Sequence, residues 1–207
     1  MKTDGIIFDM DGTIWDTLSA VCLAWNEVFA KEKVDKIITT DELSQYMGLP
    51  MTEIALRMFP GKKYQEIEEV YEKCMTYENE YIASHGAVLY DGLIEMLERA
   101  GKIAPLFIVS NCQSGYIESF FKAYNTAGYF KDYECFGNTR KYKTDNIKSI
   151  VARNNLKNPV YVGDTQGDCD SSREAGVPFI YAQYGFGKVK SPDYTINTPL
   201  ELLDIIS

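Results

Sequence analysis

The sequence predicts an α/β protein in which a doubly wound parallel sheet lies between two layers of helices, with an all-helical subdomain inserted after the first strand. Three observations predict this three-layer fold. Short runs rich in Ile, Val, Phe and Tyr recur along the chain, and helical patterns separate them. These runs are apolar throughout, which is typical of parallel strands buried on both faces of a sheet. One long block, residues 16–85, contains helical patterns only.

Each apolar run predicts one strand, and the stretches between the runs predict the helices that cover the sheet. The expected strands are residues 5–9, 106–110, 133–136, 161–164 and 178–182. The expected helices are residues 93–100, 115–124, 146–154 and 170–175, with Gly101 and Gly176 at helix ends. A last helix is expected at "TPLE", where Thr198 would be the N-cap, Pro199 would occupy the first turn and Glu201 would complete a capping box.

The helical block divides the chain into two expected domains. Residues 1–15 and 86–207 would form the α/β core, and residues 16–85 would form a helical cap. Within this block, the loop "YMGLP" and Arg57 are candidates for contact with a substrate, although an exposed arginine on an amphipathic helix is an equally good interpretation. Six glutamates near the end of the block are interpreted mostly as a solvated helix face and are assigned no chemistry: Glu66, Glu68, Glu69, Glu72, Glu78 and Glu80.

Composition excludes several classes of function. The chain has 207 residues, of which 45% are hydrophobic, so it can bury a substantial core. Its net charge is -9 and no run of Lys or Arg forms a basic stripe, so no nucleic-acid partner is expected. Five scattered cysteines without a CxxC pair favour reduced thiols in the cytoplasm, and no apolar segment is long enough to cross a membrane. We expect a monomer or a weak homodimer.

Polar residues follow the predicted strands at the points where the strands end. Ligands of an open parallel sheet bind beyond these carboxyl ends. The stretch "GIIFDMDGTIWDT" ends a strand in Asp9 and adds a second acid at Asp11, and "GDTQGD" likewise ends a strand in Asp164 and adds a second acid at Asp168. The residues expected at this edge of the sheet are Asp9, Asp11, Ser110, Asn111, Asp164 and Asp168, with Lys141 or Lys143 nearby in "TRKYKTDN".

This set of side chains predicts a metal-assisted phosphoryl-transfer site. Carboxylates gathered at one edge repel each other unless a cation lies between them, and their hard oxygens suit Mg²⁺. Ser110 and backbone N–H groups suit phosphate oxygens, and a lysine suits their charge. Gly12 fits the sharp turn and close backbone approach that such a loop needs, and Thr13 in the same turn is a further candidate for phosphate binding.

These motifs resemble the haloacid dehalogenase superfamily, in its phosphoglycolate phosphatase and β-phosphoglucomutase branch. "DMDGT" is similar to the first motif of the family, "VSN" to the second, Lys143 to the third and "GDTQGD" to the fourth. The motifs occur in the family's order along the whole chain. The helical block, with "MGLPMTEIALRMFP" at its substrate-facing loop, resembles the cap of that branch.

The resemblance implies a role for each matching residue. Asp9 would be the nucleophile that forms an aspartyl-phosphate, and Asp11 would be the general acid and base. Mg²⁺ would be held by Asp9, by the backbone carbonyl of Asp11 and by Asp164. The remaining roles, as the resemblance implies them, are orientation of metal-bound waters by Asp168, binding of the phosphoryl group by Ser110 and Asn111, and neutralisation of charge by Lys143.

The implied activity is hydrolysis of a small phosphomonoester, and three alternatives stay open. A hexose-phosphate mutase would use the same site, although Thr13 favours a phosphatase. A 2-haloacid dehalogenase would lack the acid at Asp11, and a phospho-aspartate switch would lack the helical insert. The third motif also departs from the family, because Thr144 follows Lys143 where proline is usual, and this leaves Lys141 as a competitor.

Overall fold

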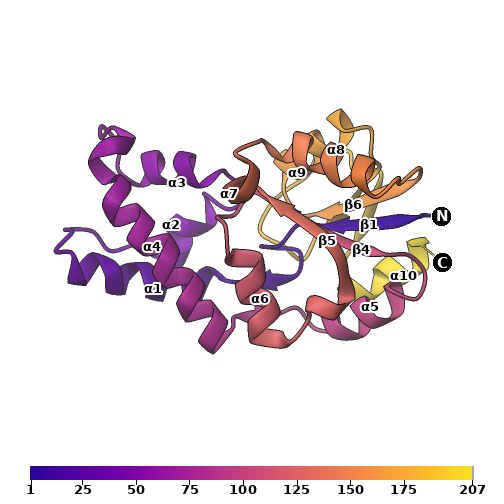
Figure 1. Cartoon of the computed structure of the whole chain (residues 1–207), viewed down its shortest axis with the longest axis horizontal. Helices are drawn as coiled ribbons and strands as arrows, with labels where there is room; N and C mark the ends of the chain where they lie inside the picture. Colours follow the sequence, from indigo (N-terminus) through magenta and orange to yellow (C-terminus); the bar gives the residue numbers. More distant parts are fainter. Residues whose placement is uncertain (207) are drawn as a thin grey trace.

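The computed structural model describes residues 1–206 and contains one six-stranded sheet and a separate two-stranded ribbon (Figure 1). All strands of the six-stranded sheet are parallel, in the order β5-β4-β1-β6-β7-β8. Their bounds are β1 Gly5–Phe8, β4 Leu106–Ser110, β5 Phe130–Cys135, β6 Pro159–Gly163, β7 Phe179–Ala182 and β8 Tyr194–Ile196. The strands β4 and β5 lie on one side of β1, and β6, β7 and β8 lie on the other. The doubly wound fold predicted from the sequence is therefore confirmed.

Alternate residues of β1, β4, β6 and β7 enter two separate cores, one on each face of the sheet. Ile6 and Phe8 of β1 belong to the larger core, whereas Ile7 belongs to the smaller one. The helices on the larger-core face are α5 Leu93–Ala100, α6 Tyr116–Tyr124 and α10 Leu202–Ile206. The helices on the opposite face are α8 Lys143–Arg153 and α9 Gln166–Glu174 (Figure 1). Because these four strands contribute to both cores, they are apolar on both faces, whereas the edge strands β5 and β8 contribute buried residues only to the larger core.

Four helices lie beyond the end of the sheet, on the left of Figure 1. They are α1 Leu18–Lys31, α2 Thr40–Ser44, α3 Met51–Met58 and α4 Tyr64–His85. Trp25 of α1 packs edge-on against Tyr71 of α4, with ring centroids 5.4 Å apart. The chain enters and leaves this block through an antiparallel ribbon of β2, Trp15–Asp16, and β3, Val88–Leu89. We propose that this block is a cap on the α/β core, with the boundaries expected from the sequence.

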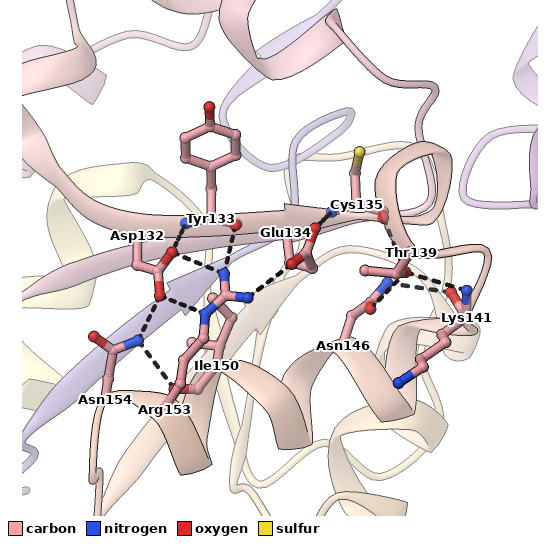
Figure 2. Close-up of polar contacts among 10 residues, drawn as sticks. All are labelled: Asp132, Tyr133, Glu134, Cys135, Thr139, Lys141, Asn146, Ile150, Arg153 and Asn154. Atoms are coloured by element: carbon pink, nitrogen blue, oxygen red, sulfur yellow. Dashed lines mark hydrogen bonds and ion pairs between the residues drawn. The ribbon is translucent and has the colours of Figure 1, made fainter.

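A polar network joins β5 to α8 and fixes the start of that helix (Figure 2). Arg153 donates to both carboxylate oxygens of Asp132, at 2.7 and 2.8 Å, and to Glu134 at 2.8 Å. At the other end of α8, the Thr139 hydroxyl donates to Asn146 at 2.8 Å, and the Asn146 amide donates to the Lys141 carbonyl. A bidentate arginine pair is stronger than an ordinary surface ion pair. The Arg153 pair therefore ties the last turn of α8 to β5, and the Asn146 contacts hold its first turn.

The structure differs from the sequence prediction at several element ends. The strand β8 was not predicted, because "YTI" is too short and too exposed to form an apolar run. Two short helices also precede α8: the 3-10 helix η1 Ala127–Tyr129 and α7 Phe136–Thr139. The capping box at Thr198 is wrong. Thr198 makes no capping hydrogen bond, and the chain first forms a 3-10 turn, η2 Pro199–Glu201, in which Glu201 accepts from the backbone N–H of Asn197 instead, at 2.8 Å. Among residues 1–206, no helix is long and apolar enough to span a membrane.

Candidate active site

Three aspartates from two neighbouring strand ends meet at the carboxyl edge of the sheet. Asp9 follows β1 directly, Asp164 follows β6 directly, and Asp168 lies in the first turn of α9. All three are buried, and one carboxylate oxygen of each lies within 4.8 Å of the others. The parallel pairing of β1 with β6, in register from Gly5 to Phe8, produces this meeting.

Lys143 is the lysine that reaches this cluster. It is the first residue of α8, and its Nζ lies 3.0 Å from Oδ1 of Asp9 and 2.5 Å from Oδ1 of Asp168. The side chain is only 3% exposed. Lys141, the competing candidate, is exposed, and Figure 2 shows its amino group directed away from the network around Thr139. The structure therefore brings Lys143, and not Lys141, into the cluster.

The three aspartates differ in how their oxygens are used. Oδ2 of Asp168 accepts from the backbone N–H and the hydroxyl of Thr165, at 2.9 and 2.7 Å, while Oδ1 contacts Lys143. Oδ2 of Asp164 accepts from the backbone N–H groups of Phe186 and Gly187, at 2.8 and 3.3 Å. Oδ1 of Asp164 is buried without a hydrogen-bond partner among residues 1–206. A buried oxygen without a partner is costly, so this atom is suited to an external ligand.

The electrostatics of the cluster also favour a bound cation. Burial and then the charge of Asp168 raise the pKa of Asp9 to about 7, while Lys143 acts in the opposite direction. Burial, Asp168 and Asp9 raise the pKa of Asp164. One lysine faces three carboxylates, and Oδ1 of Asp9, which contacts Lys143, makes no further hydrogen bond. These carboxylate oxygens are hard ligands that lack hydrogen-bond partners, and they fit a Mg²⁺ ion.

Gly12 allows the loop after β1 to approach Asp164. Its φ is +81°, in the left-handed region that favours glycine, and a Cβ atom there would lie 2.2 Å from Oδ2 of Asp164.

The hydrogen bonds from the backbone N–H groups of Phe186 and Gly187 to Asp164 were not predicted, because backbone donors do not depend on the residue type. The glycines of "GFGK" after the fifth predicted strand were the available signal.

Asp11 faces away from the three-aspartate cluster and toward the helical block. Its Oδ1 accepts from the hydroxyls of Thr17 and Tyr116, each at 2.6 Å. Burial raises the pKa of Asp11, and these two hydrogen bonds act to lower it. Thr17 and Tyr116 were not among the predicted site residues. Thr17 stands inside the quoted "DGTIWDT" motif, whereas no local pattern marks Tyr116.

Among the predicted phosphate-binding residues, Ser110 and Asn111 line one cavity with Asp9 and Asp11, whereas Gly12 and Thr13 do not line it. Ser110 is the last residue of β4 and is buried, and its Oγ accepts a long hydrogen bond from the N–H of Cys112, at 3.4 Å. Oδ1 of Asn111 and the hydroxyl of Thr13 are buried without partners among the described residues. Ser110 and Asn111 therefore retain hydrogen-bonding capacity beside Asp9 and Asp11 in one cavity.

That cavity, of about 50 Å³, lies between the helical block and the sheet edge. Asp9, Asp11 and Ser110 line its core side, and the loop Met47, Gly48 and Leu49 lines the opposite side. The Asn111 amide donates to the Gly48 carbonyl at 2.8 Å and links the two sides. The predicted contact loop thus lines the cavity. Arg57 is exposed on α3 and does not line it.

The interpretation of Glu78 as part of a solvated helix face is wrong. Glu78 is 3% exposed and lines the cavity, whereas the sequence analysis assigned it to a solvated face. Trp25 Nε1 donates to its Oε2 at 2.6 Å. The buried side of α4 consists of Ile67, Tyr71, Cys74, Glu78 and Ile82. Their spacing of three or four residues marks this buried side in the sequence. The signal was missed because a charged residue, Glu78, occupies one position of an otherwise apolar stripe.

The chain belongs to the haloacid dehalogenase-like hydrolase family, whose sequence model matches residues 6–182. The predicted family membership is therefore confirmed. Phosphoglycolate phosphatase of Aquifex aeolicus is 24% identical over 97% of this chain and 95% of its own length. N-acetylmuramic acid 6-phosphate phosphatase of Pseudomonas aeruginosa is 25% identical over 100% of this chain and 96% of its own length.

Two solved structures share the fold over nearly the whole chain. A haloacid dehalogenase-like family protein from Streptococcus pneumoniae aligns with a TM-score of 0.84 at 22% identity, covering 99% of this chain and 98% of that one. CbbY from Rhodobacter sphaeroides, in complex with phosphate, aligns with a TM-score of 0.83 at 17% identity, covering 97% of this chain and 96% of that one. The protein is thus a hydrolase of this family, and its named relatives include phosphatases.

Proposed function

We propose that the protein is a Mg²⁺-dependent phosphatase that hydrolyses a small phosphomonoester through an aspartyl-phosphate on Asp9. The observation that carries this proposal is the buried cluster of Asp9, Asp164 and Asp168 around Lys143, next to a cavity that Asp9 shares with Asp11. The names of the relatives support phosphate esters as the substrate class.

In the proposed first step, a carboxylate oxygen of Asp9 attacks phosphorus and the bond from phosphorus to the leaving oxygen breaks. Asp11 gives its proton to that oxygen, so the alcohol leaves uncharged. In the second step, water attacks the phosphorus of the aspartyl-phosphate, Asp11 takes a proton from this water, and Asp9 is released as a carboxylate. The raised pKa of Asp11 is consistent with an acid that holds its proton until it is needed.

Mg²⁺ would be held by Asp9, by Asp164 and by the backbone carbonyl of Asp11, and it would offset the negative charge of the phosphoryl group. Asp168 has both oxygens engaged by Lys143 and Thr165, so we propose that it would orient metal-bound waters and would not itself bind the ion. Lys143 would stabilise the charge that develops near Asp9.

The remaining predicted residues would bind the transferred group. Ser110 and Thr13 would donate hydrogen bonds to phosphoryl oxygens from hydroxyls that have little or no engagement in the described structure. Asn111 would donate from the second N–H of its amide group, because the first N–H is held by the Gly48 carbonyl. The turn at Gly12 would let the backbone approach these oxygens. We further propose a cytoplasmic location, which agrees with five buried free cysteines.

The test is hydrolysis of 4-nitrophenyl phosphate by wild type and by Asp9→Asn, each with Mg²⁺ and with a chelator. We expect repeated release of phosphate by wild type with Mg²⁺ only, and loss of turnover in Asp9→Asn. Equal rates for the two proteins would remove Asp9 from its proposed role. A single release of phosphate per molecule would instead favour a phospho-aspartate switch.

A further inference from the structure

We propose that Glu78 selects the leaving group, so that the substrates are phosphate esters of uncharged, hydroxyl-bearing alcohols and esters with a carboxylate on the leaving group are poor substrates. This inference rests on the proposed function and adds a substrate class to it. It concerns the helical-block side of the cavity, opposite the three-aspartate cluster.

Glu78 is positioned where the leaving group would lie. It projects from α4 into the cavity that Asp9, Asp11 and Ser110 line from the core. Trp25 of α1 holds one of its oxygens, Oε2, at 2.6 Å. Asp11, the proposed acid for the leaving oxygen, lines the same cavity and is close enough for its charge to raise the pKa of Glu78. An alcohol released at Asp11 would therefore meet Glu78.

The residues from 1 to 206 that line the cavity offer no cation to a carboxylate on the leaving group. Within the described part of the chain, no lysine, arginine or histidine lines the cavity, and Glu78 has no ion pair. Lys143 is already engaged by Asp9 and Asp168 on the core side. A carboxylate would leave water and enter a space without a cation to pair with it, which is strongly unfavourable even where Glu78 and Asp11 are protonated.

A hydroxyl-bearing leaving group suits the same surroundings. Burial raises the pKa of Glu78 to about 8, partly offset by hydrogen bonds with Gln113 and Trp25, so the carboxyl is mostly protonated near neutral pH. A protonated carboxyl both donates and accepts, as a hydroxyl does. A hydroxyl on the leaving group would gain a hydrogen bond with Glu78 that an ester without the hydroxyl does not make, which favours the hydroxyl-bearing ester.

The experiment compares two esters of similar size that differ at one carbon. Glycerol 1-phosphate carries a CH₂OH group where 3-phosphoglycerate carries a carboxylate. For wild type with Mg²⁺ we expect a kcat/KM for glycerol 1-phosphate at least about tenfold higher than for 3-phosphoglycerate. An equal or higher value for 3-phosphoglycerate would overturn the proposed substrate class.

Variants test whether Glu78 causes this preference. Glu78→Leu removes the hydrogen-bonding group and is expected to lower kcat/KM for glycerol 1-phosphate about tenfold to a hundredfold more than for 4-nitrophenyl phosphate, which lacks the hydroxyl. Glu78→Gln keeps a donor and an acceptor and should retain most of the preference. Glu80→Gln changes an exposed glutamate of the same helix and is the matched control. Equal losses on both esters in Glu78→Leu would assign Glu78 a structural role only.

The outcomes separate this inference from the proposed function. If 4-nitrophenyl phosphate is not hydrolysed by wild type, the proposed phosphatase activity fails. If it is hydrolysed in an Asp9-dependent way and 3-phosphoglycerate is the better of the two glycerol-derived esters, only the role of Glu78 fails. The wild-type comparison decides the substrate class even if Glu78→Leu does not fold.

Discussion

Replacing Glu78 by Gln should change how the stability of the protein depends on pH. The carboxyl of Glu78 is buried without a cation, and its pKa is raised from 4.5 to about 8, chiefly by burial. Gln has nearly the same shape and can still accept the hydrogen bond that Trp25 donates at 2.6 Å. The substitution therefore removes the titration of this group while preserving its packing.

The expected size of the effect follows from proton linkage. Above pH 4.5 the unfolded chain releases the Glu78 proton, while the folded protein holds it up to about pH 8. The stabilisation from Glu78 is thus fully present below pH 4.5 and is lost as the pH rises through 8. Between pH 5 and pH 8 this loss amounts to about 3–4 kcal/mol, since a shift of one pKa unit corresponds to about 1.36 kcal/mol. Glu78→Gln should gain that much stability relative to wild type over the same interval.

The assay is urea unfolding of wild type, Glu78→Gln and Glu80→Gln, followed by far-ultraviolet circular dichroism at pH 5, 6.5 and 8. Comparing the variant with wild type at each pH cancels the titration of the other groups, except for their interaction with Glu78 itself. The groups that interact with it are Asp11, Tyr116, Tyr71 and Cys74.

A difference between Glu78→Gln and wild type that stays constant from pH 5 to pH 8 would refute the reasoning. It would mean that Glu78 is ionised in the folded protein at the same pH as in the unfolded chain, and hence that it is solvated. Glu80→Gln, at an exposed position of α4, should follow the wild-type pH dependence throughout.

Three further substitutions test the other side of the cavity. Lys143→Met should abolish measurable turnover and lower the stability by about 3 kcal/mol, because buried acids lose their cation; Lys141→Met, at an exposed position, should match wild type in both assays. Asp11→Asn should still bind Mg²⁺ in calorimetry but lose about 10²–10⁴ in rate, and a wild-type rate would contradict its role. Gly12→Ala should lower both the melting temperature and turnover, since its Cβ would lie 2.2 Å from Asp164; unchanged values would show that the loop adapts freely.

The sequence was sufficient to predict which residues meet at the sheet edge. Asp9, Ser110 and Asp164 follow or end apolar runs, and parallel pairing places the ends of such runs on one edge of the sheet. They meet because β4 and β6 are the direct neighbours of β1. Lys143 was harder to assign, because Lys141 stands two residues away in an irregular segment. The helical start at residue 143, rather than at 146, decides which lysine is buried.

Contacts between distant segments could not be predicted from local patterns. The hydroxyl of Tyr116 on Asp11 and the backbone N–H groups of Phe186 and Gly187 on Asp164 depend on how separate loops pack. Glu78 is a different case. Its position within the buried stripe of α4 was visible in the spacing, but its charge favoured a solvated interpretation, and only tertiary packing shows that it is enclosed.

The central claim is that a divalent cation joins Asp9 and Asp164, and calorimetric titration with Mg²⁺ tests it most directly. Wild type should bind one ion, and Asp164→Asn should bind it at least about tenfold more weakly. Asp145→Asn, which alters an exposed acid in the first turn of α8, should bind as wild type does. Equal Mg²⁺ affinity in wild type and Asp164→Asn would contradict the account.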